Sequence, residues 1–107
     1  LKLVNASGEE VTEFSVNDTV YALVITKNNT AADEVRVVAI ASYDETNTMI
    51  DIKTVDLTTK AGKFGMVDIS DNISVSASGA KTIKAYLWSD WRSIKPLCQS
   101  VGAALKQ

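Results

Sequence analysis

Two tryptophans and a tyrosine stand close together near the end of the sequence, at Tyr86, Trp88 and Trp91. A flat aromatic ring can stack on the apolar face of a sugar ring, while nearby polar groups bond to the sugar hydroxyls. Lys84 and Asp90 supply polar groups in the same segment. These five residues form the candidate ligand-binding set, and a saccharide is the ligand class that they suit.

The element that carries these residues decides whether they can meet a ligand. In a β-strand, Lys84, Tyr86 and Trp88 share one face and the apolar residues between them share the other. If Lys84 points to solvent, the two rings form an exposed row. In the alternative, the rings face the core and Lys84 extends its stem along a sheet edge. For Trp88 the core position is the expected one, because large aromatic residues in small domains are more often buried.

Trp91 stands in a polar segment beside Asp90 and Arg92, where burial explains an indole less easily. It could be a surface contact for a ligand or a cap folded over the end of the domain, and the sequence leaves both open. Tyr43 and Asp44 offer a second polar position at the end of a predicted strand. A tyrosine at such a position usually packs against a neighbour and bonds locally.

Catalysis is not expected of this chain. It contains no histidine, which excludes Ser-His and Cys-His nucleophile pairs. A pair of carboxylates could in principle hydrolyse a glycosidic bond. The candidates for such a pair are Asp44, Glu45, Asp51 and Asp56. They lie in or beside a predicted hairpin, where acidic residues usually solvate a turn, so we expect a non-enzymatic domain.

No cofactor or metal ion is expected either. Cys98 is the only cysteine, so the chain can form no internal disulfide and no thiolate-rich metal site. Asp68, Asp71 and Asn72 could offer oxygen ligands to a structural calcium ion, but their spacing matches no EF-hand loop.

Length and charge limit the classes of partner. A chain of 107 residues that is 46% hydrophobic suits one compact domain spanning residues 1–107. A net charge of −2 without a basic stripe does not favour nucleic acid. No apolar run approaches the roughly 18 residues of a membrane span. An anionic polysaccharide stays open as a ligand if the fold gathers the dispersed lysines on one face. These are Lys53, Lys60, Lys63, Lys84 and Lys95.

Short apolar runs separated by turn residues predict an all-β fold. The predicted strands cover residues 1–4, 11–14, 19–26, 34–43, 49–57, 64–69, 73–75 and 81–89. Residues 94–99 are expected to return along the last of these in a hairpin, and residues 101–105 to form a turn of helix. The strand at 19–26 is apolar on both faces, which predicts a central, buried position. We expect an antiparallel two-sheet β-sandwich of immunoglobulin or fibronectin III type, with seven to eight strands.

Three segments carry a resemblance to a known class of protein. They are 38–44 (VAIASYD), 83–90 (IKAYLWSD) and 94–97 (IKPL). This pattern resembles small Ig-like sandwich modules of secreted, multidomain cell-surface or polysaccharide-degrading proteins of Clostridia-like bacteria, over roughly residues 35–99. Trp91 and Arg92 depart from it, since small or polar turn residues are expected at those positions.

The resemblance implies an extracellular accessory unit, excised from a larger secreted or cell-surface protein. Such a unit is either a carbohydrate-binding module or a spacer that contacts neighbouring domains. The first predicts an exposed aromatic surface around Trp88 and Trp91 that meets a plant cell-wall or bacterial surface polysaccharide. The second predicts buried tryptophans. The sequence favours carbohydrate binding because of Trp91.

Overall fold

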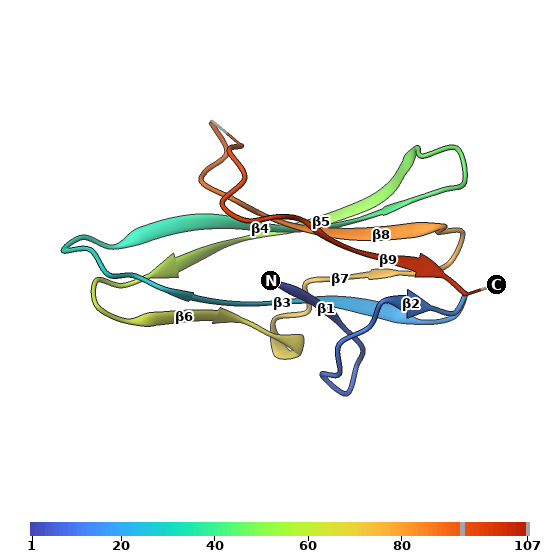
Figure 1. Ribbon diagram of the computed structural model, residues 1–107, viewed down its shortest axis with the longest axis horizontal. Coiled ribbons are helices and arrows are strands. Elements are labelled where there is room, and N and C mark those ends of the chain that lie inside the picture. The colour runs from blue at the N-terminus through green and yellow to red at the C-terminus, as the bar shows by residue number, and fades with distance from the viewer. Residues whose placement is uncertain (93, 107) are drawn as a thin grey trace.

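The computed structural model, which describes residues 1–92 and 94–106, consists of two β-sheets that lie face to face (Figure 1). The first sheet contains β1 (Lys2–Val4), β3 (Thr19–Lys27), β6 (Phe64–Val67) and β7 (Ser74–Ser76). The second contains, in order, β2 (Glu13–Phe14), β9 (Val101–Leu105), β8 (Thr82–Trp88), β4 (Glu34–Tyr43) and β5 (Met49–Thr59). A short 3₁₀ helix, η1 (Ile69–Asp71), joins β6 to β7. The predicted all-β, two-sheet architecture is confirmed.

Strand β3 is central in the first sheet, as predicted. It pairs with β1 on one edge and with β6 and β7 on the other, always antiparallel. The prediction that both of its faces are buried is wrong. Val20, Ala22 and Val24 point into the core, but Leu23 is half-buried and Ile25 is 62% exposed. Only one face of this sheet is covered by the other sheet, so the opposite face of β3 meets solvent.

Strand β4 is central in the second sheet, between β5 and β8. Val38 and Ile40 belong to the main core between the sheets. Val37, Ala39 and Ala41 lie on the outer face of the sheet, and each is still at most 1% exposed. Something must therefore cover the outer face of β4, and the residues that do so form the candidate site below.

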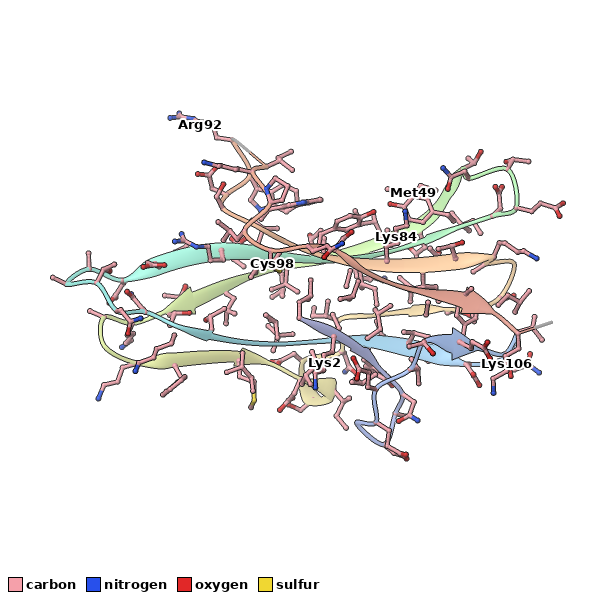
Figure 2. All side chains as sticks on the ribbon, viewed as in Figure 1. Lys2, Met49, Lys84, Arg92, Cys98 and Lys106 are labelled. Carbon is pink, nitrogen blue, oxygen red and sulfur yellow. The ribbon has the colours of Figure 1, made fainter. Side chains whose placement is uncertain are left out.

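The core fills the space between the two sheets with alternating side chains of facing strands, and the sticks in Figure 2 show this filled layer. Phe14, Ile40 and Ile83 are among the largest of its fully buried side chains. Phe14 comes from β2, which pairs in parallel with β9, so the expectation of a wholly antiparallel sandwich is wrong at this edge. That pairing ties the beginning of the chain to its last strand and closes one edge of the core.

The C-terminal segment differs from the prediction in two respects. Residues 101–105 form strand β9 rather than a turn of helix, because Ala103 is buried in the core between exposed Gly102 and Ala104.

Residues 94–99 form no strand: the one pairing there is an isolated bridge from Trp88 to Pro96. Ile94 has φ 48°, a left-handed conformation that a β-branched residue rarely adopts within a strand. Position 93, at the tip of the expected hairpin, lies outside the described residues. In all, the described residues form nine strands rather than seven or eight.

Asn28 is a buried polar residue just beyond the end of β3, at 0% exposure. Its side-chain NH₂ donates to the carbonyls of Ala32 and Thr59, at 2.7 and 2.9 Å. Its side-chain oxygen accepts from both the backbone N–H and the hydroxyl of Thr30. Asn28 thus joins the β3–β4 loop to the end of β5. The sequence indicates a turn here but not this burial.

Among residues 1–92 and 94–106, no helix is long and apolar enough to cross a membrane.

Candidate functional site

Strand β8 places its aromatic residues on the outer face of the second sheet. Ile83, Ala85 and Leu87 are buried toward the core, whereas Tyr86 and Trp88 alternate with them and are half-buried on the other side. The expectation that Trp88 is a core residue is therefore wrong. The register of β8 aligns Ala85 with Ile40, so that the small and aliphatic side chains fill the space between the sheets and the rings are left outside.

Four rings form a contiguous cluster on this face, which we call the aromatic row: Tyr43, Tyr86, Trp88 and Trp91. Tyr86 and Trp88 are stacked, with ring centroids 5.4 Å apart. Trp91 meets Trp88 edge to face at 6.3 Å. The hydroxyls of Tyr43 and Tyr86 are hydrogen-bonded at 2.9 Å. The stacked and the edge-to-face arrangements are both among those that aromatic pairs prefer, so the contacts between the rings stabilise the cluster.

The aromatic row rests on the small outer side chains of β4. Trp88 lies opposite Val37 in the register, and Tyr86 lies opposite Ala39. Directly opposed side chains on one face of an antiparallel pair are close neighbours, so the rings cover these two residues. This explains why Val37 and Ala39 are buried on an outer face. Tyr86 and Trp88 are thus both part of the packing and part of the surface.

The loop between β8 and β9 holds Trp91 over the outer face of the second sheet, and not over the end of the domain. The loop between β8 and β9 rises above β4 in Figure 1. Two backbone bonds, from Ser89 N–H to the Lys95 carbonyl and from Leu97 N–H to the Leu87 carbonyl, close it. The indole Nε1 donates to Oδ1 of Asp56 at 3.1 Å, and the side chain remains 52% exposed. Trp91 is therefore an oriented ring with much of its surface in solvent.

The two polar candidates lie at the ends of this arrangement. The Lys84 ammonium group is 5.9 Å from the ring centroid of Tyr43, a cation–π contact. A Cβ placed on Gly102 would lie 3.6 Å from Cγ of Lys84, so the lysine stem extends over β9. Asp90 is exposed in the loop beside Trp91, and its carbonyl accepts from the N–H of Ile94. The structure brings Lys84, Tyr86, Trp88 and Trp91 onto one face, with Asp90 in the adjoining loop.

Sequence reasoning did not connect Asp56 with Trp91, which are 35 positions apart. The register between β4 and β5 is the feature that could have predicted this contact. Once β4 pairs with β5, Asp56 lies opposite Val37 and so faces outward beside the aromatic row.

Burial and the hydrogen bond with Tyr43 raise the pKa of Tyr86 to about 12, and burial is the larger cause. The folded state therefore holds the Tyr86 proton more tightly than the unfolded state, whose tyrosine pKa is 10.0. The resulting stability is fully present below pH 10 and is lost as the pH rises toward 12.

We expect Tyr43→Phe to lower the pKa of Tyr86 without restoring the ordinary value, because burial remains. Titration of the tyrosine ring carbons by NMR measures this. Tyr21→Phe, on the other sheet, is the control, and an unchanged titration in Tyr43→Phe would contradict the hydrogen-bond contribution.

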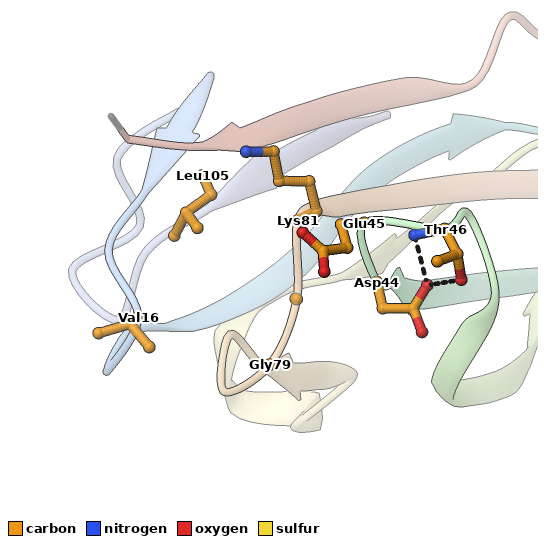
Figure 3. Close-up of a pocket in the computed structure, with 8 residues that line it drawn as sticks. Val16, Asp44, Glu45, Thr46, Gly79, Lys81 and Leu105 are labelled. Atoms are coloured by element: carbon orange, nitrogen blue, oxygen red, sulfur yellow. Dashed lines mark hydrogen bonds between the residues drawn. The ribbon is translucent and has the colours of Figure 1, made fainter.

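A hollow of about 340 Å³ lies at one end of the two sheets (Figure 3). Its lining includes Asp44, Glu45, Thr46 and Lys81. Oδ1 of Asp44 accepts from the hydroxyl and backbone N–H of Thr46 and from the N–H of Thr48. These bonds, the Thr46 hydroxyl first, lower the pKa of Asp44. Asp44 is therefore an ionised anchor of the β4–β5 turn.

The four carboxylates considered for glycoside hydrolysis do not converge. Asp51 lies opposite Ser42 and Asp56 opposite Val37, which places them on opposite faces of the sheet. Asp44 and Glu45 belong to the β4–β5 turn. A hydrolase of that kind needs one carboxylic acid with a raised pKa, and the pKa of Asp44 is shifted in the other direction.

The acidic residues considered as calcium ligands instead form hydrogen bonds that cap η1. Asp68 accepts from the backbone N–H and the hydroxyl of Ser70, while Asp71 accepts from the N–H of Asp68. This reciprocal arrangement is a capping box at the start of the 3₁₀ turn. Within the part of the chain that the structure describes, no three histidine, cysteine, aspartate or glutamate side chains are grouped as a metal site would require.

Searches against protein-family models, curated proteins and solved structures found no match for this chain.

Proposed function

We propose that this chain is a non-catalytic, extracellular carbohydrate-binding module of a polysaccharide-degrading or cell-surface protein. The observation that carries the proposal is the state of Trp91. Its indole is oriented by Asp56, stands against Trp88 and is 52% exposed. An exposed tryptophan held in one orientation loses little conformational freedom when a ligand stacks on it, which favours binding.

The surroundings of Trp91 supply the polar groups that a sugar needs. Asp90 and Arg92 flank it in the loop and are exposed, and Lys84 lies farther along the same face. Sugar hydroxyls both donate and accept hydrogen bonds, so a mixture of carboxylate, guanidinium and ammonium groups around a ring suits them. We infer that a polysaccharide chain lies across the outer face of the second sheet, with one sugar on Trp91.

Strand order supports an immunoglobulin or fibronectin III type of sandwich. The second sheet has the order β2-β9-β8-β4-β5, and β2 pairs in parallel with β9. In the lettering of that fold, β9, β8, β4 and β5 correspond to G, F, C and C′, while β1, β3 and β7 correspond to A, B and E. A C′ strand added to the GFC sheet is a feature of the variable type. The aromatic row then lies on the GFCC′ face.

The alternative, a spacer or protein-interaction module with no sugar affinity, is favoured by a different surface. Ile25, Phe64 and Met66 are 62, 69 and 52% exposed. Ile25 lies opposite Met66 in the β3–β6 register, and Phe64 follows on the same face. Clustered exposed apolar side chains often mark a protein contact. This patch lies on the first sheet, away from the aromatic row.

Tryptophan fluorescence during titration with neutral and anionic cell-wall polysaccharides tests the proposal. We expect a saturable shift for at least one polysaccharide, and a loss of affinity of about 30-fold or more in Trp91→Ala, since a central aromatic contact is typically worth 2 kcal/mol or more. Because Trp91 is exposed, this variant should fold normally.

Two further variants separate ring orientation from other effects. Asp56→Ala removes the acceptor of the indole N–H and should weaken binding, whereas Asp56→Asn keeps an acceptor oxygen and should retain most of it. Phe64→Ala on the other sheet is the matched control. Unresponsive fluorescence across the whole panel, or equal affinity in Trp91→Ala, would contradict carbohydrate binding by this face and favour the interaction module.

A further inference from the structure

The pairing of β8 with the C-terminal segment is interrupted next to the aromatic row. Ala85 lies opposite Val101, so a regular ladder would place Cys98 opposite Trp88. Trp88 instead pairs with Pro96. The segment between Pro96 and Val101 therefore contains two more residues than its partner, and it bulges away from β8. Irregularities of this kind are frequent beside binding sites, where they redirect side chains.

The bulge opens a pocket of about 200 Å³ against the two stacked rings. Tyr86 and Trp88 line it together with exposed Gln99 and Ser100. The complete lining is Tyr86, Leu87, Trp88, Pro96, Cys98, Gln99 and Ser100. The lining thus combines two aromatic rings with residues that carry an amide and a hydroxyl, and no lining residue carries a formal charge.

This chemistry selects among saccharides. The amide of Gln99 and the hydroxyl of Ser100 can each donate and accept, as the hydroxyls of a neutral sugar require. A uronate carboxylate in the same place would lose its water without gaining a cation, which is unfavourable. None of the five lysines that could have favoured an anionic ligand lines this pocket. Lys53 is on β5, Lys60 and Lys63 lie in the β5–β6 turn, Lys84 is on β8, and Lys95 is in the loop next to Pro96.

We propose that this pocket is a subsite for one uncharged sugar ring, and that the ligand of the module is a neutral polysaccharide. The inference rests on the proposed carbohydrate-binding function and specifies its ligand class. Trp88 links the two contacts, because it lines the pocket and meets the Trp91 ring at 6.3 Å. A sugar on Trp91 and a sugar in the pocket can therefore belong to one chain that crosses Trp88.

Cys98 provides a direct reporter for the pocket. It is the only cysteine, it is exposed, and it lies in the lining. The rate of its alkylation by iodoacetamide, followed by mass spectrometry, is measured with cellohexaose, xylohexaose, mannohexaose and a galacturonate hexamer, alongside tryptophan fluorescence. For a neutral oligosaccharide that binds, we expect alkylation to slow about tenfold at a concentration ten times the dissociation constant. The galacturonate hexamer should give no protection.

The outcomes separate failure of the subsite from failure of the function. A fluorescence shift without protection of Cys98 would show that sugar binds at Trp91 but not in the pocket, which overturns the subsite. Tighter binding of the galacturonate hexamer would overturn the ligand class. No response in either measurement with any oligosaccharide would overturn both the subsite and the proposed function.

Two variants supply a readout that does not depend on the thiol. Gln99→Ala and Ser100→Ala should each weaken binding of the protecting oligosaccharide about five- to tenfold, the usual effect of one lost hydrogen bond. Ser7→Ala, in an exposed loop on the other side of the molecule, is the control. Unchanged affinity in both pocket variants would count against the subsite even if Cys98 were protected.

Discussion

Replacing Asn28 by alanine is expected to lower the free energy of unfolding by about 3–4 kcal/mol, close to 1 kcal/mol for each of its four side-chain hydrogen bonds. The Asn28 side chain is completely buried, and its bond to the Thr59 carbonyl is buried with it, so water cannot readily replace that bond. The Thr59 carbonyl at the end of β5 would lose its bond to the amide, as would the Ala32 carbonyl in the β3–β4 loop. Urea unfolding followed by circular dichroism gives the difference.

Two companion variants make this expectation specific. Asn29→Ala removes an exposed neighbour and should change stability by less than about 0.5 kcal/mol. Asn28→Asp keeps the shape but turns an oxygen, instead of the NH₂ donor, toward two carbonyl groups. At neutral pH it should be at least as destabilising as alanine. It should recover stability as the pH falls, because protonation restores a donor. Equal stability of the alanine variant and the parent chain would refute the role of Asn28.

Ile40→Ala is expected to cost about 2–5 kcal/mol, the range for truncating a large aliphatic side chain in a close-packed core. Ile40 is fully buried in the middle of β4, opposite Ala85 of β8, and belongs to the cluster between the sheets. A cavity there cannot close without moving one sheet against the other. Thermal unfolding measured by calorimetry, together with the urea midpoint, provides the check.

Ile52→Ala is the matched control for this substitution. Ile52 has the same side chain on β5, but it is 40% exposed, so its truncation should cost under about 1 kcal/mol. If the two isoleucine variants were equally stable, the packing of β4 between the sheets would be wrong. Ile40→Val, which removes a single methyl group, should fall between them at about 0.5–1.5 kcal/mol.

The class of the fold follows from local patterns, since alternating apolar residues and turn punctuation are visible in the sequence. Strands β3, β4 and β5 begin where the pattern predicts them. The alanines and leucine of β9 are good helix formers, which is why the sequence predicts a turn of helix there. The pairing of β9 with β8 decides the outcome, and partners distant in the chain leave no trace in local propensity.

The site was predictable in composition but not in orientation. The alternation of side chains along a strand groups Lys84, Tyr86 and Trp88 on one face, and the structure agrees. Alternation alone does not say which face of the strand is turned toward the core. That choice depends on Ile83, Ala85 and Leu87 fitting between two sheets, a property of the whole fold. The bond from Trp91 to Asp56 and the pocket beside Gln99 depend on register across three strands, which no single segment of sequence contains.

The parallel pairing of β2 with β9 also determines how the domain would carry tension. Pulling the two chain ends apart first loads β1, which precedes β2 and pairs with β3. Once β1 has detached, β2 and β9 are drawn in opposite directions along their own axes, because the strands run the same way. The bonds from Ala104 N–H to the Thr12 carbonyl and from Lys106 N–H to the Phe14 carbonyl are then loaded together in shear. A terminal hairpin would instead open one bond at a time. Under load, the buried Phe14 side chain would leave the core only after both of these bonds had failed.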